Sequence, residues 1–197
     1  VYWPVAGHDF VNFDDEKYVT RNDVVLRGLT WESARLVITT PSPGGWPHPL
    51  ALISHMLDVQ LYGLKPAGHH LTNVFLHIAA AILLFFALLR MTEDTWKSAF
   101  VASVFALHPI QVESVAWVAE RKNVLNGFFF MMALRAYAGY ARCARRPAPG
   151  LYAGALSASV LSLLAKSVVV SLPGLLFLLD FWPLTRKDPL RRRILEK

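Results

Sequence analysis

Charged residues are scarce in this chain of 197 residues: 17% are charged, whereas 54% are hydrophobic. Soluble domains usually carry about a quarter charged residues, so this composition excludes an ordinary soluble domain. The single cysteine, Cys143, excludes an internal disulfide. The sequence has no GxGxxG, P-loop, GxSxG or HExxH motif, so it gives no support to nucleotide-driven or serine-hydrolase chemistry.

Apolar segments of membrane-spanning length recur instead, and they predict an all-α, polytopic membrane helical bundle. We expect spans at 71–89, 98–118, 123–141, 151–165 and 168–182. The predicted organisation is the end of a truncated first transmembrane helix (1–6), a large extracytoplasmic first loop (7–70), a bundle of about five spans (71–184) and a basic cytoplasmic tail (185–197). Within the first loop, the patterns at 29–39 and 50–62 predict amphipathic helices.

The distribution of basic residues predicts the orientation of this bundle. The net charge is +6, but half of the Lys and Arg lie in short loops at 90–97, 142–146 and 186–193, and this distribution argues against a nucleic-acid partner. The positive-inside rule places all three loops in the cytoplasm. The intervening segments then form two hairpins, with outer tips at 113–122 and at Lys166. A single helix through Lys166 would put its ammonium in the membrane at a cost of about 2.5–3.5 kcal/mol.

This orientation gathers the unusual polar residues on the extracytoplasmic side. They are Asp14, Asp15, Glu113, Arg121, Lys122 and Lys166. Asp14 and Asp15 are adjacent carboxylates, which repel each other, so one of them is suited to taking a proton as a general base. The alternative is a solvated acidic turn.

Further candidates follow from spacing. Glu113, Trp117 and Arg121 are four residues apart and would share one face of a continuous helix, where Arg121 could bind a phosphate and Glu113 could orient it. The alternative is a structural ion pair or an interfacial anchor. Lys166 is a second candidate phosphate ligand, or a snorkelling anchor.

A polar stripe enters the first clear span. His70, Asn73 and His77 recur at helical spacing, and His70 is a candidate ligand-binding residue, with hydrogen bonding between helices as the alternative. Adjacent histidines such as His69 and His70 point about 100° apart on a helix. Because neither a Cys nor a clear Asp or His partner lies at ligand spacing from them, we predict no metal site.

Five blocks of this sequence occur in the order seen in a known family and cover nearly the whole chain. They are FVNFDDEKYVTRN, GLTWES, HPLALISHMLDVQLYGLKPAGHHLTNVFLH, ALHPIQVESVAWVAERKNVL and SLLAKSVVVSLPGLLFLLDFWPL. In these blocks the chain resembles the membrane portion of the bacterial tetratricopeptide-repeat-containing GT-C glycosyltransferases. These are similar to the animal transmembrane-and-tetratricopeptide-repeat O-mannosyltransferases.

The resemblance implies a GT-C enzyme of the bacterial inner membrane with its active site facing the periplasm. Such an enzyme transfers a sugar, of mannose-like hexose type, from a polyprenyl-phosphate carrier to a protein or glycan hydroxyl with inversion, and it needs no further cofactor. A carboxylate of the first external loop acts as the base, which corresponds to Asp14 or Asp15. Arg121 and Lys166 would stabilise the leaving phosphate. Many members have Lys-Pro where this chain has Lys166-Ser167, which weakens the case for Lys166.

The sequence lacks the later spanning helices and the 34-residue tetratricopeptide repeats of such enzymes, so we expect activity of a whole enzyme rather than of this fragment. Two other functions are compatible with the same pattern. One is a non-catalytic membrane scaffold or assembly module, in which the external loop binds a protein. The other is a transporter of lipid-linked sugars, which would need polar residues deep in the bundle.

Overall fold

The structure is a computed structural model that describes residues 1–40, 48–143, 148–186, 191 and 194. Every regular element in this described part is helical, which confirms the predicted all-α class. Arg145, Arg146 and most of the predicted basic tail (185–197) lie outside the described residues.

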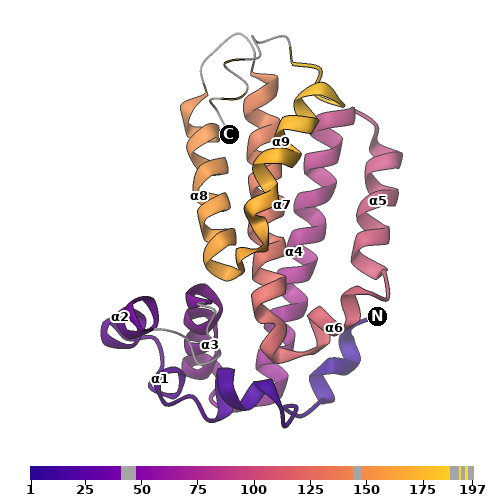
Figure 1. Cartoon of the computed structure of the whole chain (residues 1–197). Coiled ribbons are helices and arrows are strands. Elements are labelled where there is room, and N and C mark those ends of the chain that lie inside the picture. The colour runs from indigo at the N-terminus through magenta and orange to yellow at the C-terminus, as the bar shows by residue number, and fades with distance from the viewer. Residues whose placement is uncertain (41–47, 144–147, 187–190, 192–193, 195–197) are drawn as a thin grey trace.

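The N-terminal segment forms short helices at one end of the molecule, the lower end in Figure 1. They are η1 (Trp3–Gly7), η2 (Glu16–Thr20), α1 (Asp23–Leu26), α2 (Trp31–Thr39) and α3 (Pro49–Tyr62). The helices predicted at 29–39 and 50–62 are therefore confirmed as α2 and α3. Side chains cap two of the short helices, because Asn22 accepts from Val24 N and the Thr30 hydroxyl accepts from Ser33 N.

Five longer helices run side by side in Figure 1. They are α4 (Pro66–Thr92), α5 (Thr95–Leu107), α7 (Arg121–Arg142), α8 (Pro149–Ala165) and α9 (Leu172–Phe181). Their shared core joins α4, α7, α8 and α9 through small and apolar side chains such as Ala87, Ala133, Ala158 and Leu176. Small residues let helix backbones approach closely. The structure confirms the helix break that His108-Pro109 predicts within the second span (98–118), because α5 ends at Leu107 and His108, which precedes a proline, is extended.

The connections between these helices fall at two opposite ends. Figure 1 shows the α4–α5 connection at the upper end, whereas α6 (Gln111–Ala116) lies at the lower end near the N-terminus and the α8–α9 connection lies at the lower end of α8, above α3. Of the described helices, α4 alone is long and apolar enough to cross a membrane; α5, α8 and α9 are apolar but shorter. The arrangement of five spans and its GT-C type stay predictions. Residues 3–7 form a 3-10 helix, and Tyr2 beside it packs edge-on against His77 of α4.

Candidate functional site

Asp15 fastens the N-terminal loop to the lower end of the helix bundle. Its side chain is fully buried, and its two oxygens accept hydrogen bonds from Val11 N at 2.8 Å and from Ala119 N at 2.7 Å. Ala119 belongs to η3 (Val118–Glu120), the short turn that leads directly into α7. Asp15 therefore positions the loop on that turn and does not face solvent.

Asp14, its neighbour, is the accessible member of the acidic pair. The Asp14 side chain is 25% exposed and forms an ion pair with Lys17 Nζ at 3.2 Å. It also interacts electrostatically with Lys122 at the start of α7. A general base must reach the proton that it abstracts, so the accessible carboxylate of Asp14 meets that requirement and the buried one of Asp15 does not.

Arg121 is buried, and its guanidinium donates hydrogen bonds to acceptors of the protein. This arrangement differs from the one expected of a phosphate ligand. Its Nη2 donates to Asp58 Oδ2 at 2.6 Å and to the carbonyl of His69 at 2.8 Å, and its Nη1 donates to Ser54 Oγ at 2.7 Å. Its Nε donates to Asn73 Oδ1. Since the guanidinium is fully buried and joins α3, α4 and α7, the structural alternative describes it better.

The expected alignment of Glu113, Trp117 and Arg121 on one helix face is wrong. The helix α6 ends at Ala116 and Trp117 is extended, with φ −90° and ψ 123°, so no continuous helix joins the three residues. Glu113 is exposed, and the carboxylate that pairs with Arg121 is that of Asp58, on α3. Sequence spacing could not show the change of direction at Trp117.

A second group of polar residues lies at the same end of the bundle and is partly exposed. Lys122 Nζ forms an ion pair with Glu120 Oε1 at 2.9 Å and lies over the ring of Tyr18 at 4.8 Å. Asn123 links this pair to Lys166, because its amide donates to Glu120 Oε2 and its oxygen accepts from Lys166 Nζ. Two lysines and one glutamate therefore form a connected group, and Lys166 ends α8 at the tip where the sequence predicted it.

Two members of the predicted polar stripe on α4 make hydrogen bonds to neighbouring elements. Asn73 Nδ2 donates to the carbonyl of Trp117 at 2.9 Å, and His77 Nε2 lies 3.1 Å from the carbonyl of Ala106. His70 is 1% exposed and its ring packs edge-on against that of His8, with centroids 6.0 Å apart. We predicted that His70 binds a ligand, but its side chain has almost no exposed surface in this structure that a ligand could contact.

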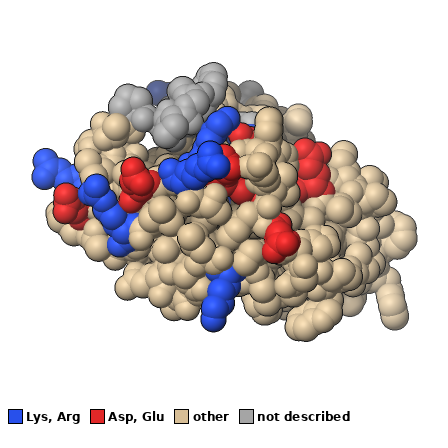
Figure 2. Space-filling model, turned by 90° about the horizontal axis from the view of Figure 1, so that it is seen from below, with Lys and Arg blue, Asp and Glu red and all other residues tan. Residues whose placement is uncertain are grey.

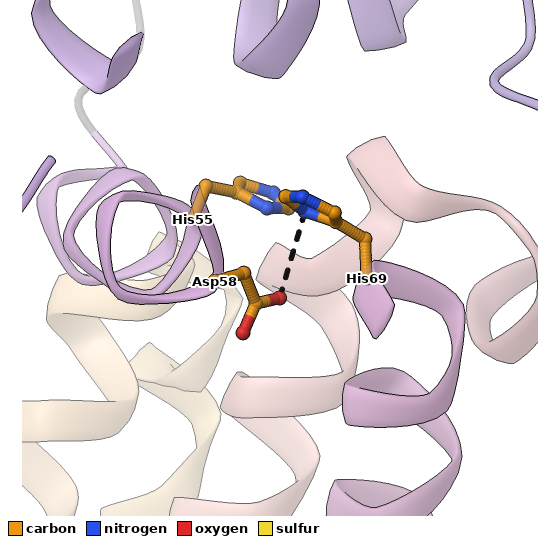
Figure 3. Close-up of side chains that lie close together, drawn as sticks. All are labelled: His55, Asp58 and His69. Atoms are coloured by element: carbon orange, nitrogen blue, oxygen red, sulfur yellow. Dashed lines mark ion pairs between the residues drawn. The ribbon is translucent and has the colours of Figure 1, made fainter. Parts of the chain in front are cut away.

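Three buried side chains, His55, Asp58 and His69, come together where α3 meets α4. Figure 3 shows the two imidazole rings stacked, with the Asp58 carboxylate below them; the ring centroids are 6.1 Å apart. Asp58 Oδ2 lies 3.6 Å from His69 Nδ1. This cluster was not predicted from the sequence, although His55 and Asp58 are spaced i, i+3 on the predicted helix 50–62, which places them on one face.

Acidic and basic side chains are interspersed on this end of the molecule. Figure 2 views it from below, and the described acidic side chains on this face alternate with Lys and Arg rather than leaving an extended basic area. Ion pairs between neighbouring residues, such as Asp14–Lys17, Glu16–Arg21 and Glu120–Lys122, also bring opposite charges together in this part of the chain. A nucleic-acid surface is typically a continuous basic patch, and this face has a different pattern.

Comparison with known proteins gives relatives of one kind. The chain is 35% identical over 145 residues to human "Protein O-mannosyl-transferase TMTC2", an alignment that covers 70% of this chain and 17% of the relative. It is 34% identical over 143 residues to the mouse protein of the same name, with the same coverage. It is 34% identical over 89 residues to mouse "Protein O-mannosyl-transferase TMTC3", covering 45% of this chain and 10% of that protein.

No family model matches the chain, and no solved structure matches it significantly. The chain spans about a sixth or less of the length of the curated relatives that it matches. These relatives are animal proteins, so the bacterial source that the resemblance implied stays a prediction. The chain is therefore similar, over most of its own length, to one part of the animal protein O-mannosyl-transferases.

Proposed function

We propose that this chain is the membrane part of a glycosyltransferase that moves a hexose of mannose type from a polyprenyl-phosphate carrier to a hydroxyl group outside the cytoplasm. The names of its relatives support glycosyl transfer, and the apolar helix α4 supports a membrane location. The observation that carries the proposal is the placement of Asp14. It is an accessible carboxylate, held beside a buried anchor, at the end of the bundle where Lys122 and Lys166 also lie.

The proposed reaction is a single displacement with inversion. Asp14 takes the proton of the acceptor hydroxyl as its oxygen attacks the anomeric carbon of the sugar. The bond between that carbon and the phosphate oxygen breaks, and the lipid phosphate leaves with the bonding electrons. Lys122 and Lys166 stabilise the negative charge on the leaving phosphate. Their side chains are partly exposed and are linked to each other through Glu120 and Asn123.

Asp15 and Arg121 have supporting roles in this proposal. Asp15 fixes the loop that carries Asp14, through its hydrogen bonds to Val11 and Ala119. Arg121 ties the start of α7 to α3 and α4, so it positions the adjacent Lys122. Both act through other residues, and neither touches the sugar or the phosphate.

The test is sugar transfer by the full-length protein in membranes, with polyprenyl-phosphate mannose as donor and an acceptor peptide rich in Ser and Thr. The variant Asp14→Asn keeps the shape of the side chain and removes its basicity. We expect its kcat to fall by a factor of about 100 or more, because general-base catalysis contributes about that much. Protein level and detergent-extracted monodispersity should match the wild type.

The matched control is Asp23→Asn, which changes another acidic residue of the same loop at the first position of α1. Its activity should stay within about twofold of the wild type, because a surface substitution away from the site changes little. An Asp14→Asn protein with wild-type kcat would refute the assignment of the base. Absence of transfer by the wild type with every polyprenyl-phosphate hexose offered would refute the proposed reaction itself.

A second candidate function rests on the exposed face of α2. Trp31 is 85% and Ile38 67% exposed, and large apolar side chains on a surface mark contacts with protein or membrane. A scaffold module would use this face, and its partner complex would be lost in a Trp31→Ala, Ile38→Ser variant. Under the transferase proposal the same variant keeps its kcat in the membrane assay, which separates the two functions.

A further inference from the structure

His55, Asp58 and His69 bring three metal-ligating atoms together inside the protein. One nitrogen of each imidazole and one oxygen of the carboxylate all lie within 4.8 Å of one another. The three residues are 0%, 2% and 0% exposed. They come from the facing ends of α3 and α4, so an ion bound between them would join these two helices (Figure 3).

The hydrogen bond of His69 defines which of its nitrogens carries the proton. His69 Nε2 lies 3.0 Å from the carbonyl oxygen of Gly63, which can only accept, so Nε2 is the donor. In the neutral ring, Nδ1 then presents a lone pair. This atom is 3.6 Å from Asp58 Oδ2, which is another acceptor. Two hydrogen-bond acceptors that face each other in a buried position are unfavourable unless a positively charged group lies between them.

His55 supplies a third unpaired ligand atom. Neither of its ring nitrogens has a hydrogen-bond partner among the described residues, and the ring is completely buried. A buried ring nitrogen with no hydrogen-bond partner is available as a ligand, and imidazole nitrogens are common ligands of metal ions.

We propose that His55, Asp58 and His69 bind one divalent transition-metal ion of the zinc class. Two imidazoles and one carboxylate are a ligand set typical of Zn²⁺, with the fourth position left to a water molecule. Bonds of about 2.0–2.2 Å in a tetrahedron place ligand atoms about 3.4 Å apart. The separation of 3.6 Å between Asp58 Oδ2 and His69 Nδ1 is close to this value, and one ligand atom of each of the three residues lies within 4.8 Å of the others.

The other hydrogen bonds of the three ligand residues also fit a metal site. Metal-binding imidazoles usually donate their other N–H to a carbonyl or carboxylate, as His69 does to Gly63. Asp58 is held from both sides, because Thr72 Oγ1 donates to its Oδ1 at 3.1 Å and Arg121 Nη2 donates to its Oδ2. A water molecule alone has two hydrogens, so it cannot satisfy three converging lone pairs.

The local charge also accommodates a cation. The carboxylates of Asp58 and Asp15 both act electrostatically on His69, whereas Arg121 contributes one positive charge there. Lys122 also acts electrostatically on His55, so two carboxylates and two cations surround the cluster before an ion binds. The ion would connect α3 to α4 close to Arg121, and its binding does not depend on whether the protein transfers a sugar.

The test is the metal content of the full-length protein, purified in detergent, supplied with Zn²⁺ and dialysed against a weak chelator. Elemental analysis of the wild type should give about one Zn²⁺ per chain. His55→Gln and His69→Gln should each retain less than about a fifth of that, because each removes one of three ligands. The matched control is His77→Gln, which changes another buried histidine of α4 outside the cluster and should keep the full content.

A second measurement needs no variant and therefore does not depend on how the variants fold. Cobalt supplied in place of zinc should give the visible absorption bands of a four-coordinate site, with an intensity that saturates at about one equivalent. A wild type that holds no zinc and develops no such bands would overturn the proposal and leave water as the occupant. Histidine variants that keep the wild-type zinc content would overturn it as well.

Discussion

Asp15 accepts a hydrogen bond from the backbone N–H of Ala119 at 2.7 Å, although the two residues are 104 positions apart. This bond holds the N-terminal loop against the turn that begins α7. The same turn places Arg121 beside the buried Asp58 and places Lys122 beside the partly exposed Glu120. The geometry of the candidate site therefore depends on Asp15, even though Asp14 is the accessible carboxylate.

The first prediction concerns the stability that this anchor provides. Asp15→Ala should lower the free energy of unfolding by about 2–4 kcal/mol, because it leaves the N–H groups of Val11 and Ala119 without an acceptor. Asp14→Ala should cost less than about 1 kcal/mol, because its ion pair with Lys17 is largely exposed to solvent. Thermal unfolding of the purified protein in detergent measures both, and equal losses would contradict the assignment of roles.

The elements of this fold could be predicted from the sequence, because their causes are local. Long apolar runs mark α4, α7 and α8, and short basic loops mark the ends at which they connect. The break at His108-Pro109 also follows from the sequence, because a residue before proline avoids helical geometry. What these patterns could not give is the length of each helix, and the apolar helices α5, α8 and α9 are shorter than a span.

The site was harder to predict, because its partners are far apart in the sequence. Arg121 pairs with Asp58, 63 residues away, and no helical spacing relates the two. The prediction that paired it with Glu113 assumed a continuous helix through Trp117, where the chain is in fact extended. The cluster of His55, Asp58 and His69 forms only because the turn between α3 and α4 brings the two helices together. The sequence shows only the i, i+3 spacing of His55 and Asp58.

The second prediction is that Arg121 acts as a structural residue. Arg121→Lys should lower the free energy of unfolding by about 3 kcal/mol or more, because one ammonium cannot reach Asn73, Ser54 and Asp58 together. Arg21→Lys is the matched control, since this arginine is exposed and its ion pair contributes less than about 1 kcal/mol. A stable Arg121→Lys protein with a raised KM for the lipid donor would instead support phosphate binding.

The third prediction concerns the close approach of α3 and α4. A Cβ atom on Gly68 would lie 2.8 Å from the Cβ atom of Tyr62, the last residue of α3, so an alanine there must push the two helices apart. We expect Gly68→Ala to destabilise the protein by about 1–3 kcal/mol. Gly127→Ala, in α7, meets nothing within 4 Å and should be neutral or stabilising by up to about 1 kcal/mol. Denaturation midpoints of the two variants would show the contrast, and its absence would mean that the helices can separate at no cost.

The fourth prediction is a loss of stability in mild acid, with His55 as a main cause. The pKa of His55 in the folded protein is well below 6.5, because burial and then the charge of Arg121 disfavour its protonated form. The unfolded chain binds a proton at His55 below about pH 6.5, whereas the folded chain does not. The stability is therefore fully present above that pH and is lost as the pH falls, by up to about 1.4 kcal/mol per pH unit.

The pKa of His48 is also lowered, by burial first and then by Lys122 and Lys166, so it adds a loss of the same sign. Unfolding free energies at about pH 7.5 and about pH 5.5, measured with a chelator present, give the size of the effect. His55→Gln should reduce the difference between the two pH values, because glutamine does not titrate. His108→Gln, at an exposed position, should leave it unchanged. If both variants show the wild-type difference, the acid sensitivity arises elsewhere, and the buried imidazole of His55 is already protonated in the folded protein.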